Sequence, residues 1–187
     1  MWRSVRSIKR NIRRLIDAGA KEFLVANLPD LSRVPGVAGP VPSMFVDVDV
    51  AARPLWVIES RVHRFNYWLN RALNRLEVNN PSVDFYRFDV FALLDAVLDA
   101  PEQLGFALDT ATPLLDEEYL FVDLPQIWTP GEPLPEDYLE QLLQNAPNAR
   151  FWDGVHPTSL GHFVIAHGAC EAKLGVGHPA CALPPPN

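Results

Sequence analysis

The fold is decided by the stretch Glu22-Phe23-Leu24-Val25-Ala26-Asn27, which lies between Gly19 and Pro29. A short, mostly apolar run bounded by glycine and proline is typical of a strand buried inside a parallel sheet. The preceding residues, 4–18, place apolar side chains at three- and four-residue steps and predict an amphipathic helix that ends at Gly19. A helix followed directly by a buried strand indicates an α/β fold.

The same alternation of helix and strand continues along the chain. The further predicted elements are a strand at 83–88 and helices at 57–76, 90–99, 136–146 and 159–173. Residues 36–56 lack clean periodicity and predict an irregular excursion at the edge of the site, and 101–133 predict an acidic, proline-rich loop region. We expect one domain over residues 1–174 and a flexible, proline-rich tail over residues 175–187.

The composition is that of a globular domain with an uneven charge. The chain has 187 residues, 48% of them hydrophobic, and a net charge of -7. Residues 1–75 carry thirteen Lys or Arg against six Asp or Glu, and the remainder carries three against seventeen. A basic N-terminal helix can meet nucleic acid or an anionic membrane surface, or it can be a solvated face attracted to the acidic half of its own chain. We expect the solvated face and no nucleic-acid partner.

Several classes of protein are disfavoured by the sequence. No stretch approaches the roughly 18 uninterrupted apolar residues of a membrane helix, so we expect no transmembrane segment. The basic start, residues 1–6, leads into a charged helix, so we expect no signal peptide. Cys170 and Cys181 can form a disulfide or remain free thiols, and their spacing leaves both open. No spacing typical of metal ligands occurs, and we predict neither a metal nor another cofactor.

The strongest chemical pattern is Asp153-Gly154-Val155-His156, which lies just before the last predicted helix. At this spacing Asp153 can accept the Nδ1 proton of His156, fix its tautomer and leave Nε2 free as a general base. Pro157 stiffens the exit from the loop, and Thr158 can cap the following helix. Alternatively, Asp153 only forms a turn and His156 is a surface residue. The flanking aromatic residues and the His-Pro-Thr helix entry favour the catalytic interpretation.

Five segments together resemble one family. The string FWDGVHPTSLGHFVIA at 151–166 resembles the last block of the GDSL (SGNH) lipase and esterase family, and 19–31, which contains Asn-Leu-Pro-Asp-Leu, resembles its strand and exit loop. Weaker likenesses follow the family order at Phe65-Asn66-x-x-Leu69, Asp84–Phe91 and Leu104-Gly105-Phe106. The family's Gly-Asp-Ser-Leu and Gly-x-Asn-Asp blocks do not occur in these residues. The chain therefore resembles the C-terminal portion of such an enzyme.

This resemblance implies a fold and a site. The fold is the family's flavodoxin-like, three-layer α/β/α sandwich of five parallel strands, here only its C-terminal part, with 22–27 and 83–88 as the last strands. By position, Asp153 and His156 match the orienting and general-base members of a Ser-His-Asp triad. Nothing in the chain matches the serine or the oxyanion donors.

The other polar candidates are assigned structural roles. Asn27 belongs to the family's later block and is not the oxyanion asparagine. We predict that Asn66, close to the apolar stripe of its helix, makes a hydrogen bond to a loop. Ser32 and Ser159 lack the strand-to-helix elbow that exposes a nucleophile.

The resemblance implies a serine-dependent ester hydrolase, present as a partial chain without its nucleophile, that acts on a small ester or lipid. The alternatives are a non-catalytic SGNH-like binding protein and an unrelated regulatory or basic-helix binding module. We expect either a complementing N-terminal segment or self-association through the edge of the strand at 22–27. Members of the family are often secreted, but the sequence leaves the localisation open.

Overall fold

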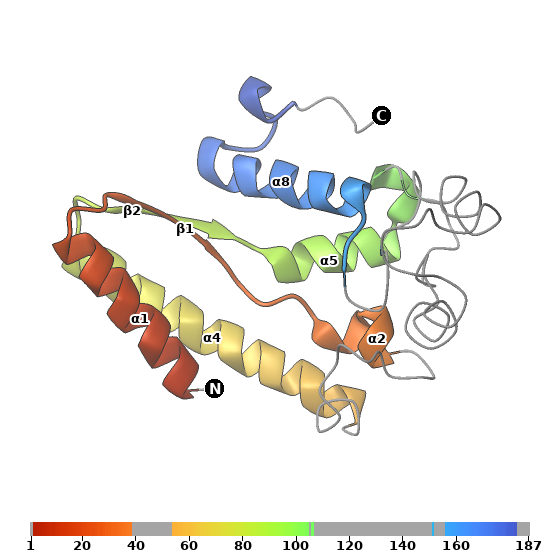
Figure 1. The fold of residues 1–187 in the computed structure, drawn as a ribbon, viewed down its shortest axis with the longest axis horizontal. Helices are drawn as coiled ribbons and strands as arrows, with labels where there is room; N and C mark the ends of the chain where they lie inside the picture. Colours follow the sequence, from red (N-terminus) through yellow and green to blue (C-terminus); the bar gives the residue numbers. More distant parts are fainter. Residues whose placement is uncertain (1, 39–53, 105, 107–150, 152–155, 183–187) are drawn as a thin grey trace, which may run out of the picture. The chain divides into compact units, whose positions relative to one another are not determined.

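The computed structural model describes residues 2–38, 54–104, 106, 151 and 156–182 (Figure 1). The predicted helix at 136–146 lies outside these ranges, as does most of the predicted excursion at 36–56. The elements in chain order are α1 (Trp2–Asp17), β1 (Glu22–Ala26), η1 (Leu31–Arg33), α2 (Pro35–Ala38), α4 (Leu55–Asn79), β2 (Asp84–Phe88), α5 (Val90–Asp99), η2 (Pro101–Leu104), α8 (Ser159–Leu174) and η5 (Pro179–Cys181).

The chain divides into two compact units. The first comprises Met1–Leu31, Trp56–Asp95 and Ala166–Leu183, and the second comprises the remaining stretches. None of the helices in the described ranges is long and apolar enough to cross a membrane.

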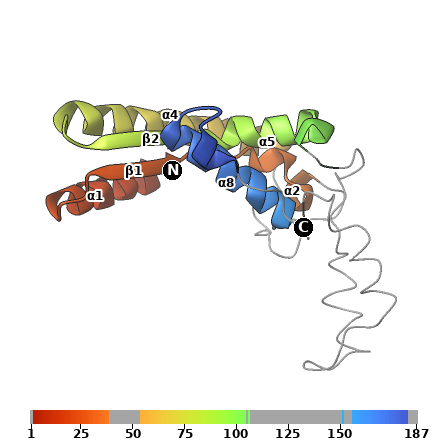
Figure 2. The same cartoon turned by 90° about the horizontal axis from the view of Figure 1, so that it is seen from above.

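The two strands form a parallel pair in the first unit. They lie side by side in both views, with Glu22 opposite Asp84 and Ala26 opposite Phe88 (Figure 1 and Figure 2). Parallel strands need a long crossover connection, and α4 lies on that connection. The predicted α/β class with parallel strands is therefore confirmed, and the predicted helices at 4–18, 57–76, 90–99 and 159–173 all form within a few residues of their expected ends.

One face of this sheet is covered by α1 and α4. Ile12 of α1 and Leu69, Leu73 and Leu76 of α4 form a buried cluster. Phe23 of β1 packs against it, and its ring stacks on Phe85 of β2 at 5.3 Å. The three-to-four-residue spacing in both helices therefore does build the core, because it gathers these side chains on the face turned toward the strands.

The other face of the sheet meets the C-terminal half of α8. Lys173 Nζ donates a hydrogen bond of 2.7 Å to Glu22 Oε2 and lies 5.6 Å from the centre of the Tyr86 ring. The hydrogen bond with Glu22 raises the pKa of Lys173. At Gly168 an added Cβ would come within 2.9 Å of Phe88 Cε2. The helix thus approaches the sheet at a position where only glycine fits without movement of the aromatic ring.

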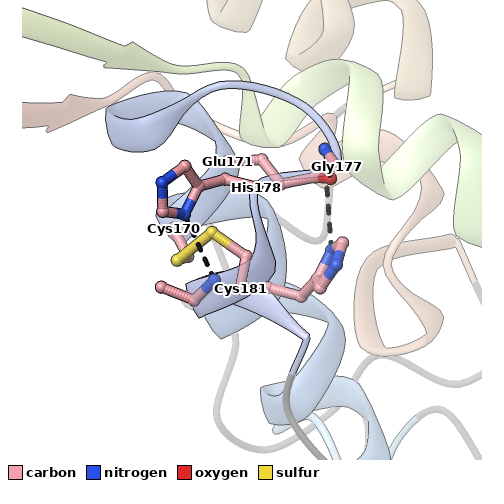
Figure 3. The surroundings of a disulfide bond; sticks show 7 residues. Cys170, Glu171, Gly177, His178 and Cys181 are labelled. Atoms are coloured by element: carbon pink, nitrogen blue, oxygen red, sulfur yellow. Dashed lines mark hydrogen bonds and ion pairs between the residues drawn. A yellow bond between two sulfur atoms is a disulfide. The ribbon is translucent and has the colours of Figure 1, made fainter.

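A disulfide holds the segment after α8 against that helix. Cys170 and Cys181 are joined, with their Cα atoms 5.5 Å apart, and Cys181 is fully buried (Figure 3). The amide of Gly177 donates to Glu171 Oε1 at 2.8 Å within the same loop. Closing a loop of this length stabilises the fold by about 3 kcal/mol in the chain-entropy model. The sequence left the state of the two cysteines open, and the structure assigns them to a disulfide.

The outer edge of β1 has no partner strand among the described residues, whose sheet contains β1 and β2 only. Leu24, in the middle of this strand, is 48% exposed. A strand with this composition is ordinarily paired on both sides, so the open edge is a site where another strand can add.

Candidate active site

The loop that carries the predicted catalytic pair is closed at its base. Phe151 and Pro157 form an antiparallel bridge, and Phe151 is buried at 6% exposure. Asp153 lies outside the described residues. His156 is exposed, just before the bridge residue Pro157. The bridge therefore fixes the backbone directly after His156, the second member of the predicted pair.

Thr158 fixes the start of α8 immediately after this loop. Its Oγ1 accepts a hydrogen bond of 3.2 Å from the amide of Gly161, and its carbonyl oxygen accepts one of 2.8 Å from the amide of His162. The side chain is 1% exposed, so this cap is shielded from water. The predicted capping role of Thr158 is confirmed. Because the cap orients the helix end, it also restricts where His156 can lie, two residues earlier.

The two serines considered as nucleophiles have unsuitable positions. Ser32 is buried at 9% exposure within η1, where a substrate carbonyl has little access. Ser159 is exposed, but it is the first residue of α8 and does not follow a strand. Neither lies at the turn from a strand into a helix that exposes a catalytic serine. In the same unit as Ser32, Arg33 forms an ion pair of 2.5 Å with Asp99 and lowers the pKa of that carboxyl group.

Asn27 joins the ends of the two strands in the first unit. Its Nδ2 donates to Asp89 Oδ1 at 2.7 Å, and its Oδ1 accepts from the amide of Phe91 at 3.0 Å. Asp89 Oδ1 also accepts from the amide of Ala92 at 3.0 Å and so caps α5. The predicted structural role of Asn27 is confirmed, whereas Asp89 was missed as its partner. The position of Asp89 just before a predicted helix was the sequence pattern that could have indicated its capping role.

Asn66 ties α4 to the loop after β1. Its Oδ1 accepts from the amide of Leu28 at 2.9 Å, and its Nδ2 donates to the carbonyl oxygen of Leu28 at 2.8 Å. The predicted hydrogen bond from this helix to a loop is confirmed. The side chain thereby satisfies both backbone groups of one loop residue, which has no strand or helix ladder to supply them.

Replacing Asn66 by alanine is expected to lower the free energy of unfolding by about 1–3 kcal/mol, because both polar groups of Leu28 lose their partner. Urea denaturation followed by circular dichroism measures the change. Asn66→Asp keeps the acceptor for the Leu28 amide but places a carboxylate oxygen against the Leu28 carbonyl oxygen, and should give at least as large a loss. Asn79→Ala, at an exposed position of the same helix, is the control. An equal loss for Asn66→Ala and Asn79→Ala would contradict this account.

A pocket of about 350 Å³ lies between α4 and the carboxyl ends of the strands in the first unit. Its polar lining includes Asn27, His63, Asn66, Arg87 and Asp89. Carboxyl ends of parallel strands are the usual place for ligands in α/β folds. The sequence already placed both strand ends, so this rule could have predicted the pocket. The ring of His63 packs on Phe91 at 4.8 Å between centroids, and Arg87 hydrogen bonds to Asn74 at 2.6 Å.

Comparison with known proteins gives a consistent match. Residues 3–169 match the family described as GDSL-like Lipase/Acylhydrolase. The chain is also 25% identical over 166 residues to the thermolabile hemolysin of Vibrio parahaemolyticus serotype O3:K6 (strain RIMD 2210633). That alignment covers 86% of this chain and 34% of the hemolysin. The chain therefore spans about a third of the length of this relative.

Proposed function

We propose that this chain, which belongs to the GDSL-like lipase and acylhydrolase family, supplies the Asp-His part of a serine-dependent ester hydrolase. The observation that carries the proposal is the family match, which runs from residue 3 to residue 169 and includes the loop before α8. The bridge at the base of that loop and the Thr158 cap support it, because a general base must be held in a fixed position.

In the proposed reaction His156 removes the proton from a serine hydroxyl as its oxygen attacks the ester carbonyl carbon. Asp153 accepts a hydrogen bond from the Nδ1–H group of His156 and stabilises the imidazolium that forms. His156 then returns the proton to the departing alcohol oxygen as the ester bond breaks. Water, activated by the same imidazole, hydrolyses the acyl-serine in a second cycle. Small esters and lipid esters are the proposed substrates, and the similarity to a protein named a hemolysin supports lipids among them.

The nucleophile and the oxyanion donors are proposed to come from another segment. The 187 residues contain no Gly-Asp-Ser sequence, and the hemolysin relative is about three times as long as the matched region. We propose that this other segment completes the five-stranded, three-layer sandwich by adding a strand beside β1.

The open edge of β1 leads to a prediction about association. Backbone groups left unpaired at a buried edge cost about 1–3 kcal/mol each. Residues 1–187 alone are therefore expected to dimerise, aggregate or bind a complementing segment through this edge. Sedimentation velocity measures the association, and hydrogen exchange at Phe23, Leu24 and Val25 locates it. A monodisperse monomer with all three amides strongly protected would show that the chain closes its own sheet.

A second candidate is a non-catalytic binding protein that keeps the fold without the reaction. The same lack of a Gly-Asp-Ser sequence favours it. Reconstitution separates the two functions. The hydrolase proposal requires that ester turnover appears when a segment with Gly-Asp-Ser and Gly-x-Asn-Asp is joined to or co-expressed with this chain, and that this turnover depends on His156.

A further inference from the structure

A strongly basic groove runs between α1 and α4 in the first unit. The two helices pack through their apolar stripes, and the groove beside that contact has a volume of about 560 Å³. Its lining contains seven Lys or Arg side chains and a single carboxylate, Asp17. The basic residues come from both helices, so their cluster is made by the packing of α1 on α4. The sequence shows basic residues on both helices, but not that they meet in one groove.

The positive charges of this groove are not compensated locally. Within the described ranges, none of its lysine or arginine side chains forms an ion pair with a carboxylate. Burial lowers the pKa of Lys9, and the nearby charges of Arg13 and Arg75 lower it further. Like charges gathered at this density repel one another and favour an anion that lies across all of them.

Aromatic rings lie at one end of the groove. Trp2 and Trp68 meet edge to face at 5.1 Å, and the guanidinium groups of Arg6 and Arg71 lie 5.8 Å and 5.7 Å from the centres of the Trp2 and Trp68 rings, respectively. Trp2 is 49% exposed, and the neighbouring Tyr67 is 54% exposed. Tryptophan and tyrosine rings of this kind, apolar in body and polar at one edge, are enriched at the level of lipid headgroups.

We propose that the groove between α1 and α4 is a docking surface for an anionic phospholipid membrane. Clustered cations on an amphipathic helix bind the phosphate and carboxylate groups of acidic headgroups, and the exposed ring edges enter the interface beside them. Single-stranded nucleic acid is the other polyanion to consider, and it binds by stacking bases on aromatic faces. Here Arg6 and Arg71 already occupy one face of each tryptophan ring, which favours the membrane.

Vesicle co-sedimentation of the full chain tests this surface without any ester turnover, so its outcome is independent of the proposed hydrolase function. The chain is expected to bind phosphatidylcholine vesicles that contain about 30% phosphatidylserine and not vesicles of phosphatidylcholine alone. Arg13→Glu combined with Arg75→Glu should weaken binding by at least about tenfold. Arg61→Glu combined with Arg64→Glu makes the same change in net charge at exposed positions outside the groove, and should change binding less than about twofold.

Each other outcome would overturn the proposal. Equal losses of vesicle binding in the two double variants would show that binding depends on net charge and not on the groove. Unchanged binding in the groove variant would show that the groove does not contact the membrane. Displacement from vesicles by millimolar inorganic phosphate would indicate a site for a small anion, and stronger displacement by a single-stranded oligonucleotide would indicate a nucleic-acid surface. Arg13→Gln with Arg75→Gln, checked by circular dichroism, provides the same test if charge reversal disturbs folding.

Discussion

Replacing His156 by alanine is expected to lower ester turnover by at least about four orders of magnitude in the protein complemented with a serine-bearing segment. Without the imidazole, no group takes the proton from the serine hydroxyl or returns it to the leaving alcohol. The side chain is exposed, so the protein should still fold without it, which circular dichroism checks. Turnover of p-nitrophenyl butyrate, measured at saturating substrate, gives the loss in kcat.

Two further variants show whether the loss of turnover is specific to the Asp153–His156 pair. His162→Ala removes an exposed imidazole further along α8 and should retain turnover within about a factor of two. Asp153→Asn should reduce kcat by about four orders of magnitude, because an amide at this position favours the wrong tautomer of His156. Turnover of the complemented His156→Ala protein within a factor of two of the parent would refute the assignment of the general base.

Within the described residues, local sequence patterns predicted both strands and four of the helices to within a few residues of their ends. Glycine ends α1 as expected, with Gly19 at a φ of 102°. The main error is the length of α4, which was expected at 57–76 and runs to Asn79. There the side chain of Asn80 donates to the carbonyl oxygen of Leu76 at 2.7 Å and stabilises the last turn. The spacing of apolar residues does not predict such a C-terminal cap, because the cap depends on a polar residue, Asn80, that follows the last apolar position of the helix.

The features that sequence reasoning missed come from pairs of distant segments. The basic groove needs α1 and α4 to pack side by side, and Asn27 finds Asp89 only because β1 and β2 end at the same edge. The bridge between Phe151 and Pro157 was also missed, since neither residue lies in a predicted strand. By contrast, the roles of Asn66 and Thr158 were predictable, because each follows from its position on one helix.

Ester turnover is expected to require complementation by a serine-bearing segment. Residues 1–187 alone are expected to hydrolyse p-nitrophenyl acetate and butyrate at the rate of the uncatalysed reaction, since they contain no Gly-Asp-Ser nucleophile. Joining them to a segment with Gly-Asp-Ser and Gly-x-Asn-Asp should raise turnover by at least about six orders of magnitude, as the serine and the oxyanion donors come into place. The same fusion with its serine changed to alanine keeps the oxyanion donors but has no nucleophile, and should lose at least about four orders of magnitude of that turnover.

The dependence of hydrolysis on both His156 and a separate serine is measured by the ester turnover of this chain with and without that segment, in the parent, in His156→Ala and in Ser159→Ala. Turnover is expected only in the complemented protein, where it should be lost in His156→Ala and retained in Ser159→Ala. Enzyme-like turnover by residues 1–187 alone that disappears in both variants would instead identify Ser159 as the nucleophile.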